Sequence, residues 1–291
     1  MSMQKRATII SSSVAAVLTL IKFVFGILSG SVSLLASAVD SILDMFVSLF
    51  NYFAVLNSEK PANKRFNYGK AKIEALAMVI EGTIITFSGL FLLYEAIKKA
   101  VLGTSSSYLD ISIYVMIISL FITSTLVFYL NYVAKVTNSM LIKADSLHYK
   151  TDILSNLAVL FSLVVVKFTG FELADVVIAM LISAYIIFCA FGFIKNGILI
   201  LLDSSIDSKM VEKVEDIIKN CQNVNGFHNL KTREAANNIY LEVHIVFNPA
   251  ITLLEAHKIS DLIEDKIKNL DSTRTWHILI HLDPYDDELK V

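Results

Sequence analysis

Two pairs of polar residues interrupt long apolar stretches of this 291-residue chain, and both pairs have a spacing that suits metal coordination. The first pair is Asp40 and Asp44, and the second is His148 and Asp152. Residues four positions apart lie on the same face of a helix, one turn apart. Three carboxylates and one imidazole suit a tetrahedral Zn²⁺ ion, and Cd²⁺ can use the same set. The spacing therefore predicts a single cation site made by two helices.

The alternative interpretation is that these side chains make polar contacts between helices, or lie just outside the hydrocarbon. Ionisable residues inside a membrane are costly and mark functional sites by default, so two matched pairs favour a cation site. Asp145 lies one turn before His148, where the sequence favours a solvated helix end. Lys22 and Glu81 also interrupt apolar stretches and are candidates for lining an aqueous path or for pairing with each other, although no spacing supports either role.

The composition indicates a membrane protein with a soluble C-terminal part. The chain is 55% hydrophobic and only 18% charged, with a mean hydropathy of +0.63. Lys and Arg outnumber Asp and Glu in residues 1–203, whereas acidic residues and five of the six His dominate residues 204–291. A net charge of −2 gives no support for nucleic-acid binding. We therefore predict a transmembrane domain over 1–203 and a soluble, acidic domain over 204–291.

The elements that must position these residues follow from hydropathy. A membrane-spanning helix needs about 20 mostly apolar residues. Six stretches qualify, at residues 8–29, 32–56, 73–97, 109–134, 146–169 and 174–202. Lys and Arg gather at the N-terminus and in the loops after the second and fourth stretches, which places both termini in the cytoplasm of a multi-pass cell-membrane protein.

The last 88 residues alternate between helical and strand patterns. Residues 211–218 and 253–270 have helical spacing, and residues 240–247 and 276–282 alternate apolar and polar side chains. On the strand at 240–247, Leu241, Val243, Ile245 and Phe247 share one face. With a further strand at 228–234, the order is αββαβ, which predicts an α+β domain with helices over one sheet face.

Histidines carry the chemistry of this domain. Strands and a helix could bring them together with an acidic residue around one or two Zn²⁺ ions. His281 and Asp283 share one face of the last strand because they are two residues apart. The alternative is that these histidines are solvent-exposed surface residues. The candidate ligands are His228, His244, His257, His281 and Asp283.

The two helical motifs, Asp-Ser-x-x-Asp at 40–44 and His-x-x-x-Asp at 148–152, resemble those of the cation diffusion facilitator family of divalent-metal/proton antiporters. The resemblance covers nearly the whole chain. It implies a homodimer of six-span subunits in the lipid bilayer, with a metallochaperone-like cytoplasmic domain and alternating access. It also implies that Asp40, Asp44, His148 and Asp152 form the transport site. In that family this ligand set goes mainly with Zn²⁺ and Cd²⁺, sometimes with Fe²⁺, whereas all-carboxylate sets go with Mn²⁺.

The resemblance extends to the C-terminal domain and to one loop. The segments around His228, His244, His257 and 280–284 are similar to those that carry regulatory Zn²⁺ ligands in bacterial zinc exporters, which implies a dimerising domain, with Asp283 as a possible bridge between two ions. Lys70 resembles a family lysine that pairs with an acidic residue at the end of the sixth helix, here Asp203, in a salt bridge that would stabilise the dimer. Lys70 also suits a positive-inside lysine. Tyr68 and Lys64 stand where some members have His ligands, so we expect no metal site in this loop.

The sequence therefore predicts a transporter and not an enzyme. We expect Zn²⁺, and also Cd²⁺ or Fe²⁺, to leave the cytoplasm in exchange for protons, with Zn²⁺ also a regulatory ligand. The alternatives are an Mn²⁺- or Fe²⁺-preferring exporter of the same family and a membrane metal sensor that does not transport. A membrane metalloenzyme is disfavoured because no His-Glu-x-x-His motif occurs.

Overall fold

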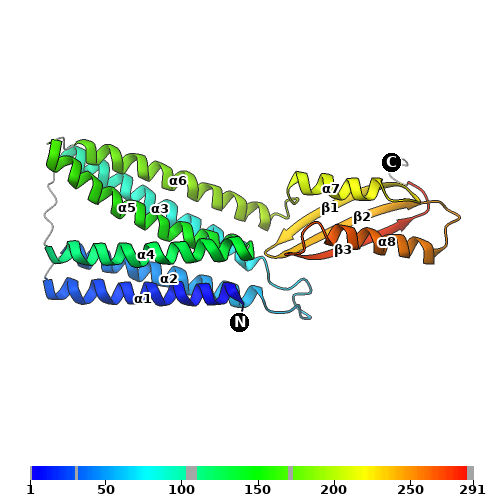
Figure 1. The fold of residues 1–291 in the computed structure, drawn as a ribbon, viewed down its shortest axis with the longest axis horizontal. Helices are drawn as coiled ribbons and strands as arrows, with labels where there is room; N and C mark the ends of the chain where they lie inside the picture. Colours follow the sequence, from blue (N-terminus) through cyan, green and yellow to red (C-terminus); the bar gives the residue numbers. More distant parts are fainter. Residues whose placement is uncertain (1, 30–31, 103–109, 170–172, 287–291) are drawn as a thin grey trace. The chain divides into compact units, whose positions relative to one another are not determined.

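The computed structural model describes residues 2–29, 32–102, 110–169 and 173–286, apart from some side chains within the helices. The chain divides into two compact units, Met1–Ile198 and Leu199–Val291. Long helices make up the first unit, and a small sheet with two helices makes up the second (Figure 1).

Six long helices form the described part of the first unit. Each contains 27 to 30 residues, so at about 1.5 Å per residue each exceeds the ~30 Å hydrocarbon core of a bilayer. Four described segments are long and apolar enough to cross a membrane, at Met3–Phe25, Ile73–Lys98, Ile117–Thr137 and Val176–Leu201, which confirms a helical membrane unit. The helices are α1 (Met3–Ser29), α2 (Val32–Ser58), α3 (Ile73–Leu102), α4 (Asp110–Thr137), α5 (Met140–Thr169) and α6 (Leu173–Leu201).

The packing of these helices places α2, α3 and α5 next to one another. Helix α5 contacts α3 and α4, α2 contacts α1 and α3, and α1 also packs along α4 (Figure 1). Helices α3 and α6 approach closely at glycines: a Cβ atom on Gly82 would lie 2.8 Å from Ile194 Cγ1, and one on Gly197 would lie 2.6 Å from Val79 Cγ2. Small residues allow such close approach between membrane helices.

The second unit has the predicted αββαβ order. The sheet order is β1-β2-β3, with β1 and β2 antiparallel and β2 and β3 parallel. All three strands begin earlier than the sequence pattern suggested, because their ends carry polar residues that break the alternation. The elements are α7 (Ser208–Lys219), β1 (Val224–Ala235), β2 (Asn238–Phe247), α8 (Leu253–Lys268) and β3 (Thr275–Asp283).

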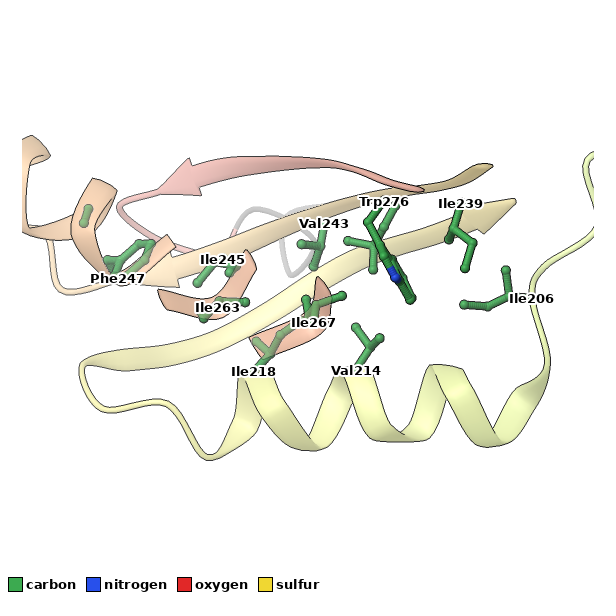
Figure 2. Close-up of a cluster of buried hydrophobic side chains, with 12 residues drawn as sticks. Ile206, Val214, Ile218, Ile239, Val243, Ile245, Phe247, Ile263, Ile267 and Trp276 are labelled. Atoms are coloured by element: carbon green, nitrogen blue, oxygen red, sulfur yellow. The ribbon is translucent and has the colours of Figure 1, made fainter. Parts of the chain in front are cut away.

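Both helices of this unit cover one face of the sheet, as predicted. The apolar face of β2, from Ile239 to Phe247, packs against Val214 and Ile218 of α7 and against Ile263 and Ile267 of α8 (Figure 2). The four residues that the alternation assigned to this face, Leu241, Val243, Ile245 and Phe247, are all at most 1% exposed. The opposite face of β2 carries Tyr240, Glu242 and His244, and this is the face available for metal ligands.

Candidate metal sites

The first candidate site lies between α2 and α5. His148 Nε2 lies 2.9 Å from Asp44 Oδ1 across the two helices. Asp152 lies one turn further along α5, and one ligand atom from each of the three residues falls within 4.8 Å of the others. His148 is only 4% exposed. The structure therefore brings together three of the four predicted ligands in a group that could hold a metal ion, which we call the membrane group.

The fourth predicted ligand, Asp40, lies on α2 one turn before Asp44, but its side chain is outside the described part of the structure. Its position relative to the other three follows only from the four-residue spacing on the helix. The complete ligand set therefore stays a prediction.

Hydrogen bonds from the residue after His148 fix α5 against its neighbours. The Tyr149 hydroxyl lies 2.6 Å from Ser48 Oγ of α2 and donates to the Ser11 carbonyl of α1 at 3.4 Å. Tyr149 is 2% exposed and Ser48 is fully buried. These contacts set the rotation of α5, and thereby the direction in which His148 points. Sequence reasoning missed both residues, although Ser48 lies one turn after Asp44 on the same helix face.

One expectation about neighbouring charged residues is wrong, and one of two alternatives for another pair is excluded. Asp145 is not at a solvated helix end: it is fully buried, and its Oδ1 accepts a hydrogen bond from Asn51 Nδ2 at 3.3 Å. Lys22 and Glu81 do not pair with each other: Lys22 Nζ donates to Ser41 Oγ at 2.8 Å, and neither Glu81 carboxylate oxygen has a hydrogen-bond partner among the described residues. Their lining of an aqueous path stays a prediction. Both corrections arise from contacts between helices, which the spacing within one helix does not reveal.

The second candidate site lies on the open face of the C-terminal sheet. The register aligns His228 of β1, His244 of β2 and His281 of β3 in one row across the three strands. Asp283 Oδ2 lies 3.1 Å from His228 Nε2 and 2.8 Å from His244 Nδ1, and its Oδ1 lies 3.2 Å from His281 Nε2. We call these four residues the sheet group. Its members His228, His244 and Asp283 are close enough to hold a metal ion.

Other histidines of this unit lie apart from the sheet group. His257 is on α8, which covers the opposite sheet face, and its Nε2 lies 3.7 Å from Asp261 Oδ2. His277 stacks on Tyr240 with ring centroids 4.7 Å apart and contacts Asn238. Asp286, which the sequence analysis did not select, lies 3.7 Å from His228 Nδ1. Its only sequence signal is an acidic side chain three residues after Asp283.

The predicted pairing of Lys70 with Asp203 stays a prediction. Lys70 Nζ lies 4.5 Å from the centroid of the Phe66 ring, within its own loop. Asp203 Oδ1 lies 3.2 Å from Arg233 NH1 of β1. Each residue thus has a partner within its own unit.

Comparison with known sequences gives matches over both units. Residues 8–202 match the cation efflux transmembrane domain, and residues 206–285 match the cytoplasmic domain of cation efflux proteins. The chain is 32% identical over 280 residues to the cation-efflux pump FieF of Serratia proteamaculans, which covers 96% of this chain and 92% of that protein. It is also 32% identical over 279 residues to FieF proteins of Escherichia coli and Escherichia fergusonii, with the same coverage.

Proposed function

Because the chain belongs to the cation diffusion facilitator family of membrane transporters for divalent metal cations, we propose that it exports Zn²⁺ from the cytoplasm in exchange for protons. The observation that carries this proposal is the membrane group, in which Asp44, His148 and Asp152 converge between two helices. One imidazole among carboxylates favours Zn²⁺ or Cd²⁺ over the harder Mn²⁺. We include Asp40 as the fourth ligand because it lies one turn from Asp44.

Proton exchange is proposed from the charge of this ligand set. Three carboxylates and a neutral imidazole carry −3 against +2 on the ion. When the cation leaves, the excess negative charge in a water-poor site favours proton uptake, and bound protons must leave before a new cation binds. His148 is the proposed proton carrier because an imidazole titrates closest to neutral pH. Alternating exposure of the group to the two sides of the membrane then couples the two flows.

The sheet group is proposed as a regulatory Zn²⁺ site in a homodimer. Three imidazoles around Asp283 supply the nitrogen and oxygen ligands that Zn²⁺ prefers. His257 remains a proposed ligand from the family resemblance alone. The distribution of Lys and Arg supports cytoplasmic termini, and hence a sheet group exposed to cytoplasmic Zn²⁺ in a protein of the cell membrane. Metal binding there would bias transport only through different affinities in different conformations.

The test is Zn²⁺ flux in proteoliposomes with an imposed proton gradient. We expect His148→Ala to abolish flux and His277→Ala, which replaces a histidine outside both groups, to retain it. Flux of His148→Ala equal to that of the unmodified protein would contradict the proposed transport site. Flux that does not respond to collapse of the proton gradient would contradict proton exchange.

The choice of metal is tested by transport competition. Zn²⁺ flux is measured with Cd²⁺, Fe²⁺ or Mn²⁺ in excess, and then each metal is measured alone. We expect Cd²⁺ to compete and to be carried. Transport is the informative measurement, because binding affinity alone favours Zn²⁺ over Fe²⁺ and Mn²⁺ at many sites. Preferential transport of Mn²⁺ would instead support the alternative metal preference.

A further inference from the structure

A second group of buried polar side chains lies beside the membrane group and has no role in the function proposed above. Glu81 of α3, Asp145 of α5 and Asn51 of α2 are at most 1% exposed. Asn51 donates to Asp145 at 3.3 Å, and the Glu81 carboxylate lies near enough to both to interact with them electrostatically. Three neighbouring helices thus bring two carboxylates and one amide together.

The oxygen atoms of this group are poorly satisfied. Within the described residues, both Glu81 carboxylate oxygens, Asp145 Oδ2 and Asn51 Oδ1 are buried, and no donor reaches them with ordinary hydrogen-bond distance and angle. Buried carboxylates without partners are strongly unfavourable unless a positive charge or protons compensate them. Glu74, a second buried glutamate of α3, shows the usual arrangement, since it accepts a hydrogen bond from Ser58 Oγ at 2.5 Å.

The position of the group relative to the membrane group is defined by the helices. Asn51 follows Asp44 by two turns of α2, which is about 10 Å along the axis. Asp145 precedes His148 by about one turn of α5. Because α2 and α5 run in opposite directions, both displacements lead toward the end of the bundle where α1 begins (Figure 1). This is the end that the Lys and Arg distribution assigns to the cytoplasm.

We propose that Glu81, Asp145 and the Asn51 side-chain oxygen form a second divalent-cation site in the membrane unit. All its ligands are oxygen atoms, so the site suits a hard cation such as Mn²⁺, in contrast to the membrane group with its imidazole. A cation bound there would lie about one helical turn from His148, between the cytoplasmic end of the bundle and the transport site. That role rests on the proposed transport function, whereas the binding of a cation does not.

The experiment counts Mn²⁺ ions bound to the purified full-length protein, by the loss of the free-ion signal in electron paramagnetic resonance. We expect Glu81→Gln, which keeps the side-chain shape and removes the charge, to bind one Mn²⁺ fewer per chain. Asp145→Asn, which removes the other carboxylate of the proposed site, should also bind one Mn²⁺ fewer per chain. Glu74→Gln is the matched control and should bind as many ions as the unmodified protein. Size-exclusion elution and Tm confirm that each variant is folded.

The same count made in an Asp44→Ala background separates the two sites. Adding Glu81→Gln to Asp44→Ala should remove one further Mn²⁺, because the ions occupy different places. An unchanged count in both Glu81→Gln and Asp145→Asn would overturn the second site and identify the group as carboxylates compensated by protons. That result would leave the proposed export function intact, since export is tested by Zn²⁺ flux of His148→Ala.

Discussion

The two candidate metal groups use the same residue types but are built on different frameworks, one on helices and one on a sheet. In the membrane group, His148 is 4% exposed and meets Asp44 across two helices. In the sheet group, three imidazoles surround Asp283, and the side chains of His228 and Asp283 are 2% and 9% exposed, whereas that of His281 is 65% exposed. An ion between α2 and α5 can leave only when these helices move, whereas the exposed His281 gives the sheet group one ligand in direct contact with solvent. The first arrangement suits transport and the second suits sensing.

The largest expected effect is the difference in Zn²⁺ flux between two variants, each of which lacks one carboxylate ligand of one group. Asp152→Ala should lower Zn²⁺ flux about 100-fold or more, because losing a direct ligand exceeds the 10–100-fold cost of losing an outer partner. Asp283→Ala should retain flux of the same order as the unmodified protein. Both are measured in proteoliposomes at equal protein content. If the two variants lose flux equally, the division between transport and sensing is wrong.

A smaller effect is expected within the C-terminal unit, on Zn²⁺ affinity measured by calorimetry of the full-length protein. Asp283→Ala should lower the Zn²⁺ affinity of the sheet group by at least about tenfold, because Asp283 contacts all three imidazoles. His257→Ala should change this affinity little, since α8 covers the other face of the sheet. A loss in His257→Ala as large as that in Asp283→Ala would instead support the ligand role that the family resemblance implies.

Removing the Tyr149 hydroxyl tests whether the rotation of α5 about its axis affects Zn²⁺ transport through the membrane group. Tyr149→Phe leaves the buried Ser48 hydroxyl without this partner and should lower stability by about 1 kcal/mol. We expect a lower Tm in detergent and a partial loss of Zn²⁺ flux with an unchanged metal preference. The matched control is Tyr132→Phe, on the exposed surface of α4. Equal behaviour of the two variants would show that the Ser48 contact does not position His148.

The smallest effect concerns acid stability of the C-terminal unit. Hydrogen bonds from the Thr252 hydroxyl and backbone N–H hold the pKa of the Glu255 carboxyl below its ordinary value. A lowered pKa in the folded state stabilises above the unfolded-state pKa, and this stabilisation is lost as pH falls through the folded-state value. The Tm difference between the unmodified protein and Glu255→Gln should therefore shrink on acidification below about pH 4. Glu212→Gln, an exposed glutamate of α7, serves as control.

The sequence allowed the fold to be predicted well because its signals are local. Long apolar stretches indicated the membrane helices, and the alternation from Leu241 to Phe247 indicated the buried face of β2. Four-residue spacing placed His148 and Asp152 on one helix face. Each of these inferences depends only on the period of a helix or strand, which short-range geometry fixes.

Contacts between elements were less predictable. No local pattern indicates that β2 lies between β1 and β3, and this order is what places His244 between His228 and His281. Similarly, the burial of Asp145 depends on Asn51, which is 94 residues away in sequence. The partners of polar side chains are set by tertiary packing, and a single sequence does not reveal that packing.

The row of histidines across the sheet has a consequence for the folding of the C-terminal unit. An ion held by His228, His244 and Asp283 would join all three strands, including β3, which lies at the sheet edge. Binding to the folded state alone adds stability by mass action, about 1.4 kcal/mol for each tenfold rise in free metal above the dissociation constant. The lifetime of this unit against proteolysis would then rise with the metal supply, so that the amount of exporter follows the amount of its cargo.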